Sequence, residues 1–250
     1  MQVGGLMRYR SADDRLSGRF WEIDFLRGIA LILMVYFHII FDLNEIYGLP
    51  VSYTSGINYY IGKISGITFI FIAGISGAFS RNNVKRGLKV LGIALVLSAV
   101  THIYGEEFGI KFGILHLLGL CMILYPLLNK LNSFILTLTG IFVLLGGLIV
   151  KRVTVTHDAF FFLGIISNSF QSSDYYPLIP WSGIFILGMA AYKFMDAMGY
   201  FDNKKTGKSN IMLPDNPINM AGRCTLIIYI LHQPVILLVL ELIKAFIGLG

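Results

Sequence analysis

A stripe of polar residues follows one face of an otherwise apolar segment near the N-terminus, EIDFLRGIALILMVYFHIIFD, residues 22–42. His38 follows Arg27 by eleven residues, so on a helix the two point in nearly the same direction, about 16 Å apart along the axis. Asp24 can pair with Arg27, three positions later. Asp42 lies one turn after His38, close enough to orient its imidazole. An oriented histidine is what general-base catalysis needs, so the stripe indicates a base at one end and a cation at the other.

Three further polar side chains fall near the ends of later apolar segments. His102 and Glu106 repeat the spacing of four residues, and His116 lies in GILHLLGL. If the N-terminus is cytoplasmic, as argued below, all three are expected at about the same depth in the membrane as His38 and Asp42. Ionisable groups inside a bilayer are costly and indicate functional sites, so His102, Glu106 and His116 are candidate catalytic residues. The alternative for each is an ordinary polar residue at the membrane interface.

A proline interrupts the last apolar segment at IIYILHQPV. Pro234 removes a backbone hydrogen bond and bends a helix, and His232 and Gln233 lie immediately before it. Loosened backbone at membrane depth is tolerated mainly where it lines a cavity, and a packed kink with a satisfied histidine is an equal alternative. Arg223, a few turns earlier, could meet a phosphate-bearing cofactor or could only anchor the helix at a basic face.

The composition predicts that membrane-spanning helices position these residues. The 250-residue chain is 56% hydrophobic and 14% charged, with a mean hydropathy of +0.72, whereas soluble domains carry about a quarter charged residues. Runs of roughly 18 or more apolar residues predict helices, because lipid offers the backbone no hydrogen-bond partners. The fold class is an all-α polytopic membrane protein with about seven transmembrane helices. They are expected near residues 22–42, 58–80, 87–104, 113–129, 133–151, 178–199 and 218–247. The segment 152–177 is expected to be re-entrant or interfacial.

The distribution of basic residues orients this helical domain. Most of the 20 Lys and Arg residues fall on the side of the N-terminus, which the positive-inside rule puts in the cytoplasm. We expect a cytoplasmic polar tail over residues 1–20, no cleavable signal peptide, and one transmembrane domain over 21–250 in the cell membrane. The same basic loops account for the net charge of +6, so no nucleic-acid partner is expected. Cys121 and Cys224 have neither metal-ligand spacing nor a disulfide pattern, and no metal is expected.

The first-helix residues also resemble a known family. Arg27, ten further residues and His38, within LRGIALILMVYFH, resemble the signature of integral-membrane acyltransferases that acylate extracytoplasmic sugars. The longer RFWEIDFLRGIALILMVYFHIIFDL, with FIFIAGISGAFS, FGILHLLGL, DYYPLIPWSGIFILGMAAY and IYILHQPV, is similar to one branch. That branch is the bacterial and archaeal relatives of the heparan-α-glucosaminide N-acetyltransferase catalytic domain. The resemblance covers about residues 19–240.

This resemblance implies acyl transfer from a cytoplasmic acyl-CoA, most simply acetyl-CoA, to a sugar, amino-sugar or glycolipid acceptor at the outer face. Arg27 would help hold the CoA, with Arg223 and His232 as further cofactor-binding residues. His38 would activate the acceptor as a general base, or a histidine would carry the acyl group in a ping-pong route. In the animal lysosomal enzyme, the histidine assigned to transfer lies between the first two helices. Residues 43–57 here contain none, so that mechanism does not carry over.

Two other functions are compatible with intramembrane histidines. A b-type haem protein ligates haem through histidine pairs, although a loop separates His102 from His116. A transporter or flippase of a lipid-linked sugar would use the same polar cavity and would move the acceptor without consuming acyl-CoA. The acceptor, the acyl length and a homo-oligomeric state stay open.

Overall fold

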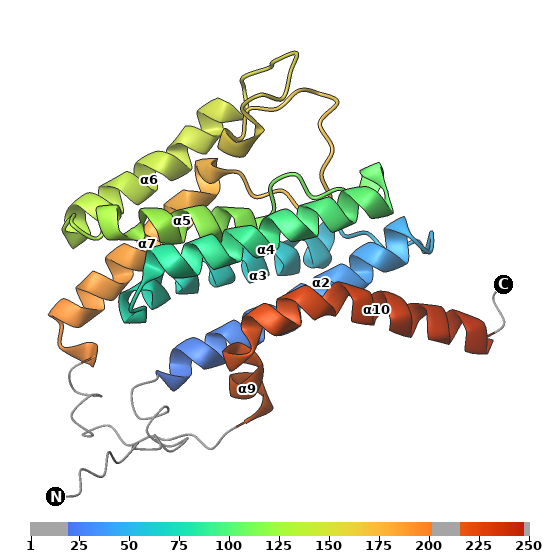
Figure 1. Ribbon diagram of the computed structural model, residues 1–250, viewed down its shortest axis with the longest axis horizontal. Coiled ribbons are helices and arrows are strands. Elements are labelled where there is room, and N and C mark those ends of the chain that lie inside the picture. The colour runs from blue at the N-terminus through green and yellow to red at the C-terminus, as the bar shows by residue number, and fades with distance from the viewer. Residues whose placement is uncertain (1–19, 202–215, 248–250) are drawn as a thin grey trace, which may run out of the picture.

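The computed structural model describes residues 20–201 and 216–247, and within those ranges the chain is helical and has no strand (Figure 1). The predicted N-terminal tail, apart from Phe20, lies outside the described residues. The helices are α2 (Trp21–Glu45), α3 (Gly56–Ser76), α4 (Asn83–Tyr104), α5 (Ile114–Leu128), α6 (Ser133–Val150), α7 (Leu178–Ala197), α9 (Pro217–Arg223) and α10 (Thr225–Ile247). Three 3₁₀ turns accompany them: η1 (Gly77–Phe79), η2 (Glu106–Phe108) and η3 (Phe161–Leu163).

The lengths and compositions of these helices confirm the predicted all-α polytopic membrane protein. In the described part of the chain, 6 helices are long and apolar enough to cross a bilayer, namely α2, α3 with η1, α4, α6, α7 and α10. The remaining expected span, α5, has 15 residues, which is about 22 Å of helix and shorter than a hydrocarbon core requires. The protein is therefore a multi-pass membrane protein in which one apolar helix is shorter than a full span.

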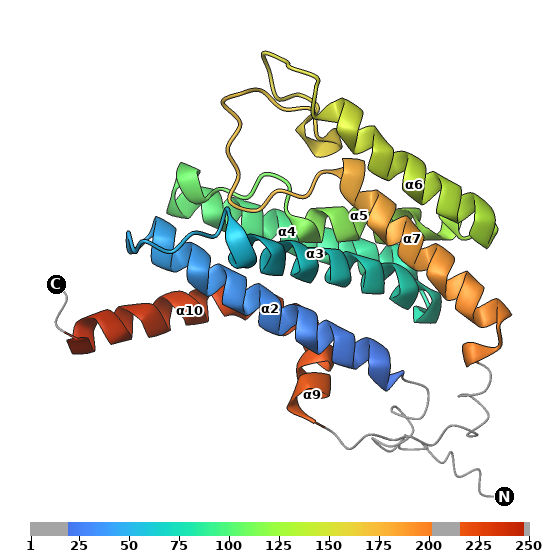
Figure 2. The same cartoon turned by 180° about the vertical axis from the view of Figure 1, so that it is seen from behind.

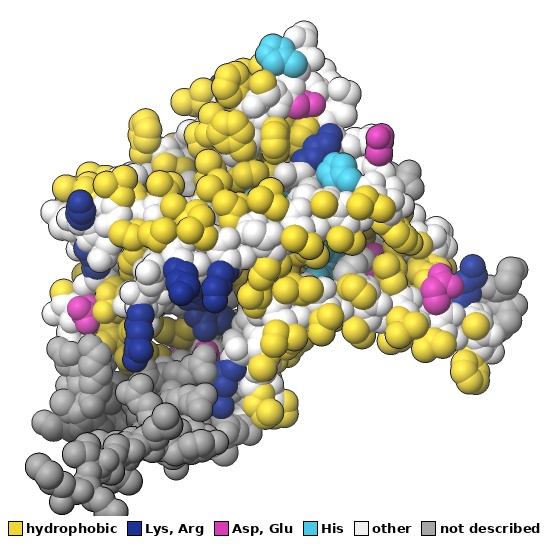
Figure 3. Space-filling model, viewed as in Figure 1, with side chains coloured by type: hydrophobic (Ala, Val, Ile, Leu, Met, Phe, Trp, Pro, Cys, Tyr) yellow, Lys and Arg dark blue, Asp and Glu magenta, His cyan; other side chains and the backbone are white. Residues whose placement is uncertain are grey.

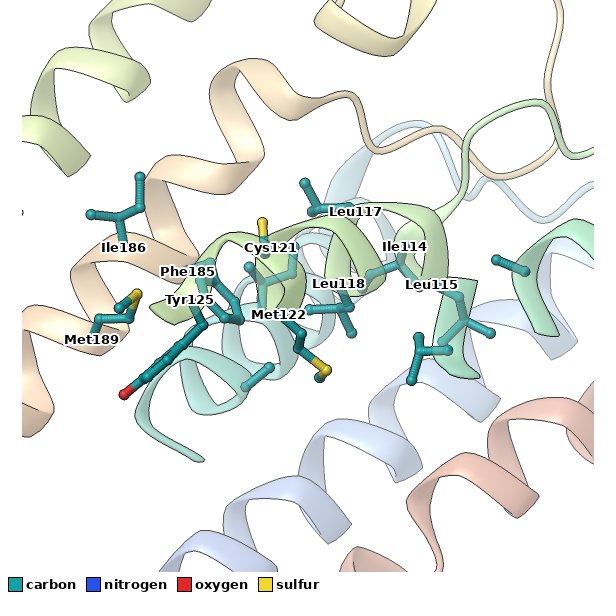
Figure 4. Packing of buried hydrophobic residues seen from close by; sticks show 14 of the residues in the cluster. Ile114, Leu115, Leu117, Leu118, Cys121, Met122, Tyr125, Phe185, Ile186 and Met189 are labelled. Carbon is teal, nitrogen blue, oxygen red and sulfur yellow. The ribbon is translucent and has the colours of Figure 1, made fainter. Parts of the chain in front are cut away.

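Helix α5 lies in the core of the bundle. Leu117, Cys121 and Tyr125 of α5 are each less than 5% exposed and belong to the same buried cluster as Phe185 and Met189 of α7 (Figure 4). A helix enclosed by protein need not match the bilayer thickness, because its ends meet other chain segments. This enclosure explains how a short, apolar helix is accommodated.

The other helices pack as a series of neighbouring pairs. Helices α2 and α7 both pack on α3, α6 packs on α7, and α4 packs on α5. Helices α9 and α10 pack on α2, and Figures 1 and 2 show α10 and α6 at opposite edges of the molecule. Two helices distant in sequence, α2 and α10, thus lie side by side.

Two helix boundaries differ from the sequence prediction. Helix α4 begins at Asn83, about one turn earlier than expected, because the side chain of Asn82 accepts a hydrogen bond from Lys85 N and caps the helix. The last predicted helix is divided at Cys224 into α9 and α10. Helix α10 continues through Pro234 as one element, which bends in its middle (Figure 1).

A close crossing of α2 and α9 depends on two glycines. A Cβ atom on Gly222 would overlap the backbone oxygen of Asp24, and a Cβ on Gly28 would overlap the backbone oxygen of Ile218. The two backbones can approach this closely only without side chains at those positions. The crossing brings Arg223, the last residue of α9, to the beginning of α2.

The segment between α6 and α7 forms a long excursion beyond the ends of those helices (Figure 1). Apart from η3 it contains no helix, and it returns to the core through Tyr176 N, which donates to Phe112 O at 2.9 Å. Phe112 and Tyr175 also form an isolated parallel bridge. The return path places Asp174 beside the first residues of α5. Whether this segment enters the membrane stays a prediction.

Candidate functional site

Two arginines from opposite ends of the sequence meet one buried carboxylate at the start of α2. Asp24 is 4% exposed. Its Oδ1 lies 3.1 Å from Arg27 Nη1, and its Oδ2 lies 3.7 Å from Arg223 Nε. Arg27 Nη2 also donates to Ser76 Oγ at 2.5 Å. The carboxylate therefore contacts both guanidinium groups and helps to orient them.

Helix α4 adds two more cations to the same place. Arg86 and Lys89 line a cavity of about 270 Å³ together with Arg27 and Arg223. Figure 3 shows Lys and Arg side chains gathered around a hollow between the N-terminal end of α4 and α9. Four cations around one opening form a site suited to phosphate groups. We call these four residues the basic mouth.

Arg86 and Lys89 were missing from the sequence-predicted site. The sequence placed them in or next to a cytoplasmic loop, because the helix was expected to begin near residue 87. With the helix beginning at Asn83, the spacing of three residues puts both on one helical face. The N-cap signal of Asn82 was the feature that could have revealed them.

The cavity behind the basic mouth is mostly apolar. Its wall consists of side chains from α3, α4, α5 and α10: Phe69, Ala73, Val90, Leu115, Leu118, Met122, Leu226 and Tyr229. Histidine and acidic side chains are also visible between α4 and α10 (Figure 3). The ring of Tyr229 lies 5.4 Å from that of His232. The apolar wall therefore connects the basic mouth with a histidine on α10.

His232 faces His38, the histidine of the first-helix stripe. The centroids of the two imidazole rings are 4.7 Å apart, with an angle of 59° between the rings. His232 Nδ1 lies 2.6 Å from the backbone oxygen of Tyr229. The structure thus brings together His38 and His232, which the sequence had assigned to different substrates.

The side chain of Asp42 is hydrogen-bonded to Gln233 and not to His38, the partner that the sequence predicted. Its side chain is fully buried, at 0% exposure, and its two oxygens accept hydrogen bonds of 2.7 and 2.9 Å from Gln233 Nε2. In the described residues no hydrogen bond joins Asp42 to His38. Asp42 therefore holds α10 against α2, and the partner of His38 is the neighbouring His232.

Asp174, which the sequence reading did not select, lies at the junction of three elements. Its Oδ2 accepts hydrogen bonds from Ile114 N at 3.0 Å, at the start of α5, and from the Tyr229 hydroxyl of α10 at 3.3 Å. Burial raises the pKa of Asp174 to about 6, against the opposite effect of these two hydrogen bonds. A single acid in DYYPLIPW, before an apolar helix, was the available signal.

We compare the free energy of unfolding of the neutral variant Asp174→Asn with that of the wild type. We expect this difference to shift in favour of the variant as the pH rises from about 4 to about 6. The folded state holds the proton more tightly than the unfolded state, whose pKa is near 3.8, so ionisation costs folding free energy on the order of 3 kcal/mol. Asparagine keeps an oxygen acceptor for both donors. Thermal unfolding in detergent across this pH range measures the difference.

Asp158→Asn is the control, because its effect on stability should change with pH in the opposite direction. The backbone hydrogen bond from Ser167 lowers the pKa of Asp158, so the wild type should gain stability relative to this variant as the pH rises through the acidic range. A constant difference between the wild type and Asp174→Asn across the range would contradict the buried position of Asp174.

His116 has local partners at the start of α5. It is 5% exposed, its Nδ1 accepts from Gly113 N at 3.2 Å, and its Nε2 lies 3.4 Å from Ser98 Oγ. Its ring stacks on Phe112, with centroids 5.4 Å apart. Within the described chain, neither a ring contact nor a hydrogen bond joins His116 to His38. These contacts make His116 a capping residue of α5.

In the described residues no hydrogen bond or ion pair joins the side chains of His102 and Glu106. Helix α4 ends at Tyr104, so Glu106 lies in η2 and the helical spacing of four residues does not apply. His102 is exposed, and its Nδ1 lies 2.8 Å from Ser98 O. Among the described residues no group of three or more His, Cys, Asp or Glu side chains is arranged to hold a metal ion.

Comparison with known proteins identifies one family. The family model described as the catalytic domain of heparan-alpha-glucosaminide N-acetyltransferase matches residues 19–234. Neither the curated proteins nor the solved structures contain a significant match. The matched range contains the basic mouth and both histidines of the His38–His232 pair.

Proposed function

Because this chain belongs to the family of the heparan-alpha-glucosaminide N-acetyltransferase catalytic domain, we propose that it transfers an acetyl or other acyl group across the membrane. The donor is a cytoplasmic acyl-CoA, and the acceptor is a sugar, amino sugar or glycolipid at the outer side. The family supports a membrane transferase, and the donor, the acceptor and the orientation belong to the proposal.

One observation carries this proposal: a cationic opening leads into an apolar cavity, and Tyr229 in the wall of that cavity contacts His232, the neighbour of His38. The basic mouth suits the phosphates of CoA. Arg27 and His38 lie on one helix, about 16 Å apart along its axis. A long, flexible thioester arm can span that distance through an apolar passage, and a small acyl donor cannot. This arrangement supports acyl-CoA as the donor.

His38 lies where the acyl group would arrive. In direct transfer, His38 takes a proton from the acceptor as its oxygen or nitrogen bonds to the acyl carbon, and the carbon–sulfur bond breaks. The proton then passes to the departing thiolate, which leaves as CoA–SH. In a ping-pong route His38 itself bonds to the acyl carbon first. Retention of labelled acyl group on the protein without acceptor distinguishes the second route.

The test is acyl transfer by the purified protein in liposomes. Labelled acetyl-CoA is supplied with a panel of amino sugars, neutral sugars and glycolipids, and both CoA release and labelled product are measured. We expect CoA release that depends on an acceptor. Transport of an acceptor without CoA release, from folded protein, would instead indicate a flippase. A Soret band with no transfer would indicate a haem protein.

Arg86→Ala with Lys89→Ala is expected to raise the KM for acyl-CoA by roughly 10-fold or more and to leave kcat nearly unchanged, because the two cations contact only the donor phosphates. The KM of the wild type should also rise with salt. Initial rates across acyl-CoA concentrations measure both effects.

Lys85→Ala is the matched control, since Lys85 lies on the same end of α4 but does not line this cavity. An unchanged KM in the double variant, or an equal change in the control, would contradict the assignment of the basic mouth to the donor.

A further inference from the structure

The histidine pair has an unequal hydrogen-bonding pattern. His232 has one fixed partner, the backbone oxygen of Tyr229, whereas no hydrogen bond to the His38 side chain is present in the described residues. The expected orienting group, Asp42, is engaged by Gln233. His38 thus needs another residue to fix its ring, and His232 is the polar side chain in contact with it.

We infer that His232 is a positioning residue for His38: its Nε2 accepts a hydrogen bond from one ring nitrogen of His38, so that the other nitrogen faces the acceptor. This inference rests on the proposed acyl transfer. The sequence suggested that His232 binds the cofactor, and this inference gives it a different role.

The tautomer of His232 follows from its backbone partner. A carbonyl oxygen only accepts hydrogen bonds, so Nδ1, at 2.6 Å from Tyr229 O, must carry the proton. In the neutral ring the second nitrogen, Nε2, then has a lone pair and can only accept. His232 Nε2 is buried and has no hydrogen-bond partner in the described structure. A buried acceptor without a donor is costly, so the site favours a donor at this nitrogen.

The separation of the rings fits a hydrogen bond between them. An N–H···N bond of about 2.9 Å between two imidazoles, with roughly 1.1 Å from each centroid to its nitrogen, puts the centroids about 5 Å apart. The observed separation is 4.7 Å. The two rings therefore already lie close enough for such a bond, and the change that we infer is a reorientation of the His38 ring toward His232 Nε2. Catalytic hydrogen bonds often tighten in this way when substrate binds.

The consequence for the reaction is a defined tautomer of His38. With one nitrogen donating to His232, the lone pair of the other nitrogen faces the acceptor. When that nitrogen takes the acceptor proton, the imidazolium formed is stabilised by the same hydrogen bond, and the proton later leaves with the CoA thiolate. The arrangement corresponds to the role of the orienting group in a catalytic triad, with a histidine held by a backbone carbonyl in that role.

Two substitutions at His232 separate positioning from bulk packing. In His232→Gln the side-chain amide can donate to Tyr229 O and offer its oxygen to His38, whereas His232→Leu retains only volume. We expect kcat to fall by about 100-fold in His232→Leu and to stay within about 10-fold of wild type in His232→Gln, with both KM values nearly unchanged. His157→Gln, an exposed loop position, is the matched control.

Equal kcat values in the Gln and Leu variants would overturn the inference, and so would a rise in the KM for acyl-CoA as the main effect. A readout independent of turnover is the ¹⁵N spectrum of histidine-labelled protein, assigned with the His38 and His232 variants. We expect His232 protonated at Nδ1, and His38 signals that shift in His232→Leu but not in His232→Gln. His232 protonated only at Nε2 would overturn the inference even if acyl transfer proceeds. An inactive wild type with the expected spectrum would instead refute the proposed function.

Discussion

Replacing His38 by alanine is expected to lower acyl transfer by about 10²–10⁴-fold, the usual contribution of a general base. The loss should fall on kcat, because in the proposed reaction the side chain contacts the reacting atoms and lies far from the donor phosphates. Acyl-CoA should still bind with nearly wild-type affinity, since the basic mouth is intact. Initial rates and equilibrium binding of a non-hydrolysable acyl-CoA analogue measure the two quantities separately.

Folding must be controlled in this experiment, because His38 packs against Phe37, Phe41 and His232. His38→Gln keeps most of the volume and should be as inactive as His38→Ala, while the melting temperature of His38→Gln stays close to that of the wild type. His157→Ala, in the exposed loop, should have full activity. Retention of more than a tenth of wild-type kcat in a folded His38→Ala protein would exclude His38 as the base.

The second large effect is expected at Arg27. Arg27→Ala should weaken acyl-CoA binding by roughly 10- to 100-fold, since a charge-assisted hydrogen bond contributes about 1.5–3 kcal/mol. Arg27 is also the residue through which Asp24 and Ser76 are joined, so its loss disturbs the orientation of the neighbouring Arg223. Isothermal titration or a fluorescent acyl-CoA competition assay measures the affinity.

Arg27→Lys separates charge from geometry. Lysine keeps the positive charge but cannot contact Asp24, Ser76 and a phosphate through a planar fork, so its affinity should lie between those of wild type and Arg27→Ala. The kcat at saturating donor should be less affected in Arg27→Ala than in His38→Ala. An unchanged donor affinity in Arg27→Ala would show that the phosphates bind elsewhere.

Sequence reasoning succeeded where the membrane environment restricts the possibilities. The apolar spans, their approximate ends and the all-α class follow from the requirement that backbone groups be hydrogen-bonded in lipid. The stripe from Arg27 to His38 follows from the period of the helix alone, and the structure places both residues on α2. Local rules of this kind need no knowledge of neighbouring helices.

The differences between the predicted and the observed contacts of the site residues have a common origin. The sequence assigned Asp42 to His38 because they are one turn apart, but Gln233, 191 positions away, engages both carboxylate oxygens. His116 was expected to join a catalytic cluster and instead caps its own helix. Asp174 was overlooked because its partners, Ile114 and Tyr229, come from two other elements.

By itself, the sequence determined that the chain spans a membrane and that one helix carries a cation and a histidine on the same face. Only the tertiary structure decided which groups stand opposite them: Arg86 and Lys89 of α4 at one end, and His232 of α10 at the other. The physical reason is that periodicity orients side chains on their own helix, whereas partners across helices depend on packing. The Gly28–Gly222 crossing that brings α9 against α2 is a long-range contact of that kind.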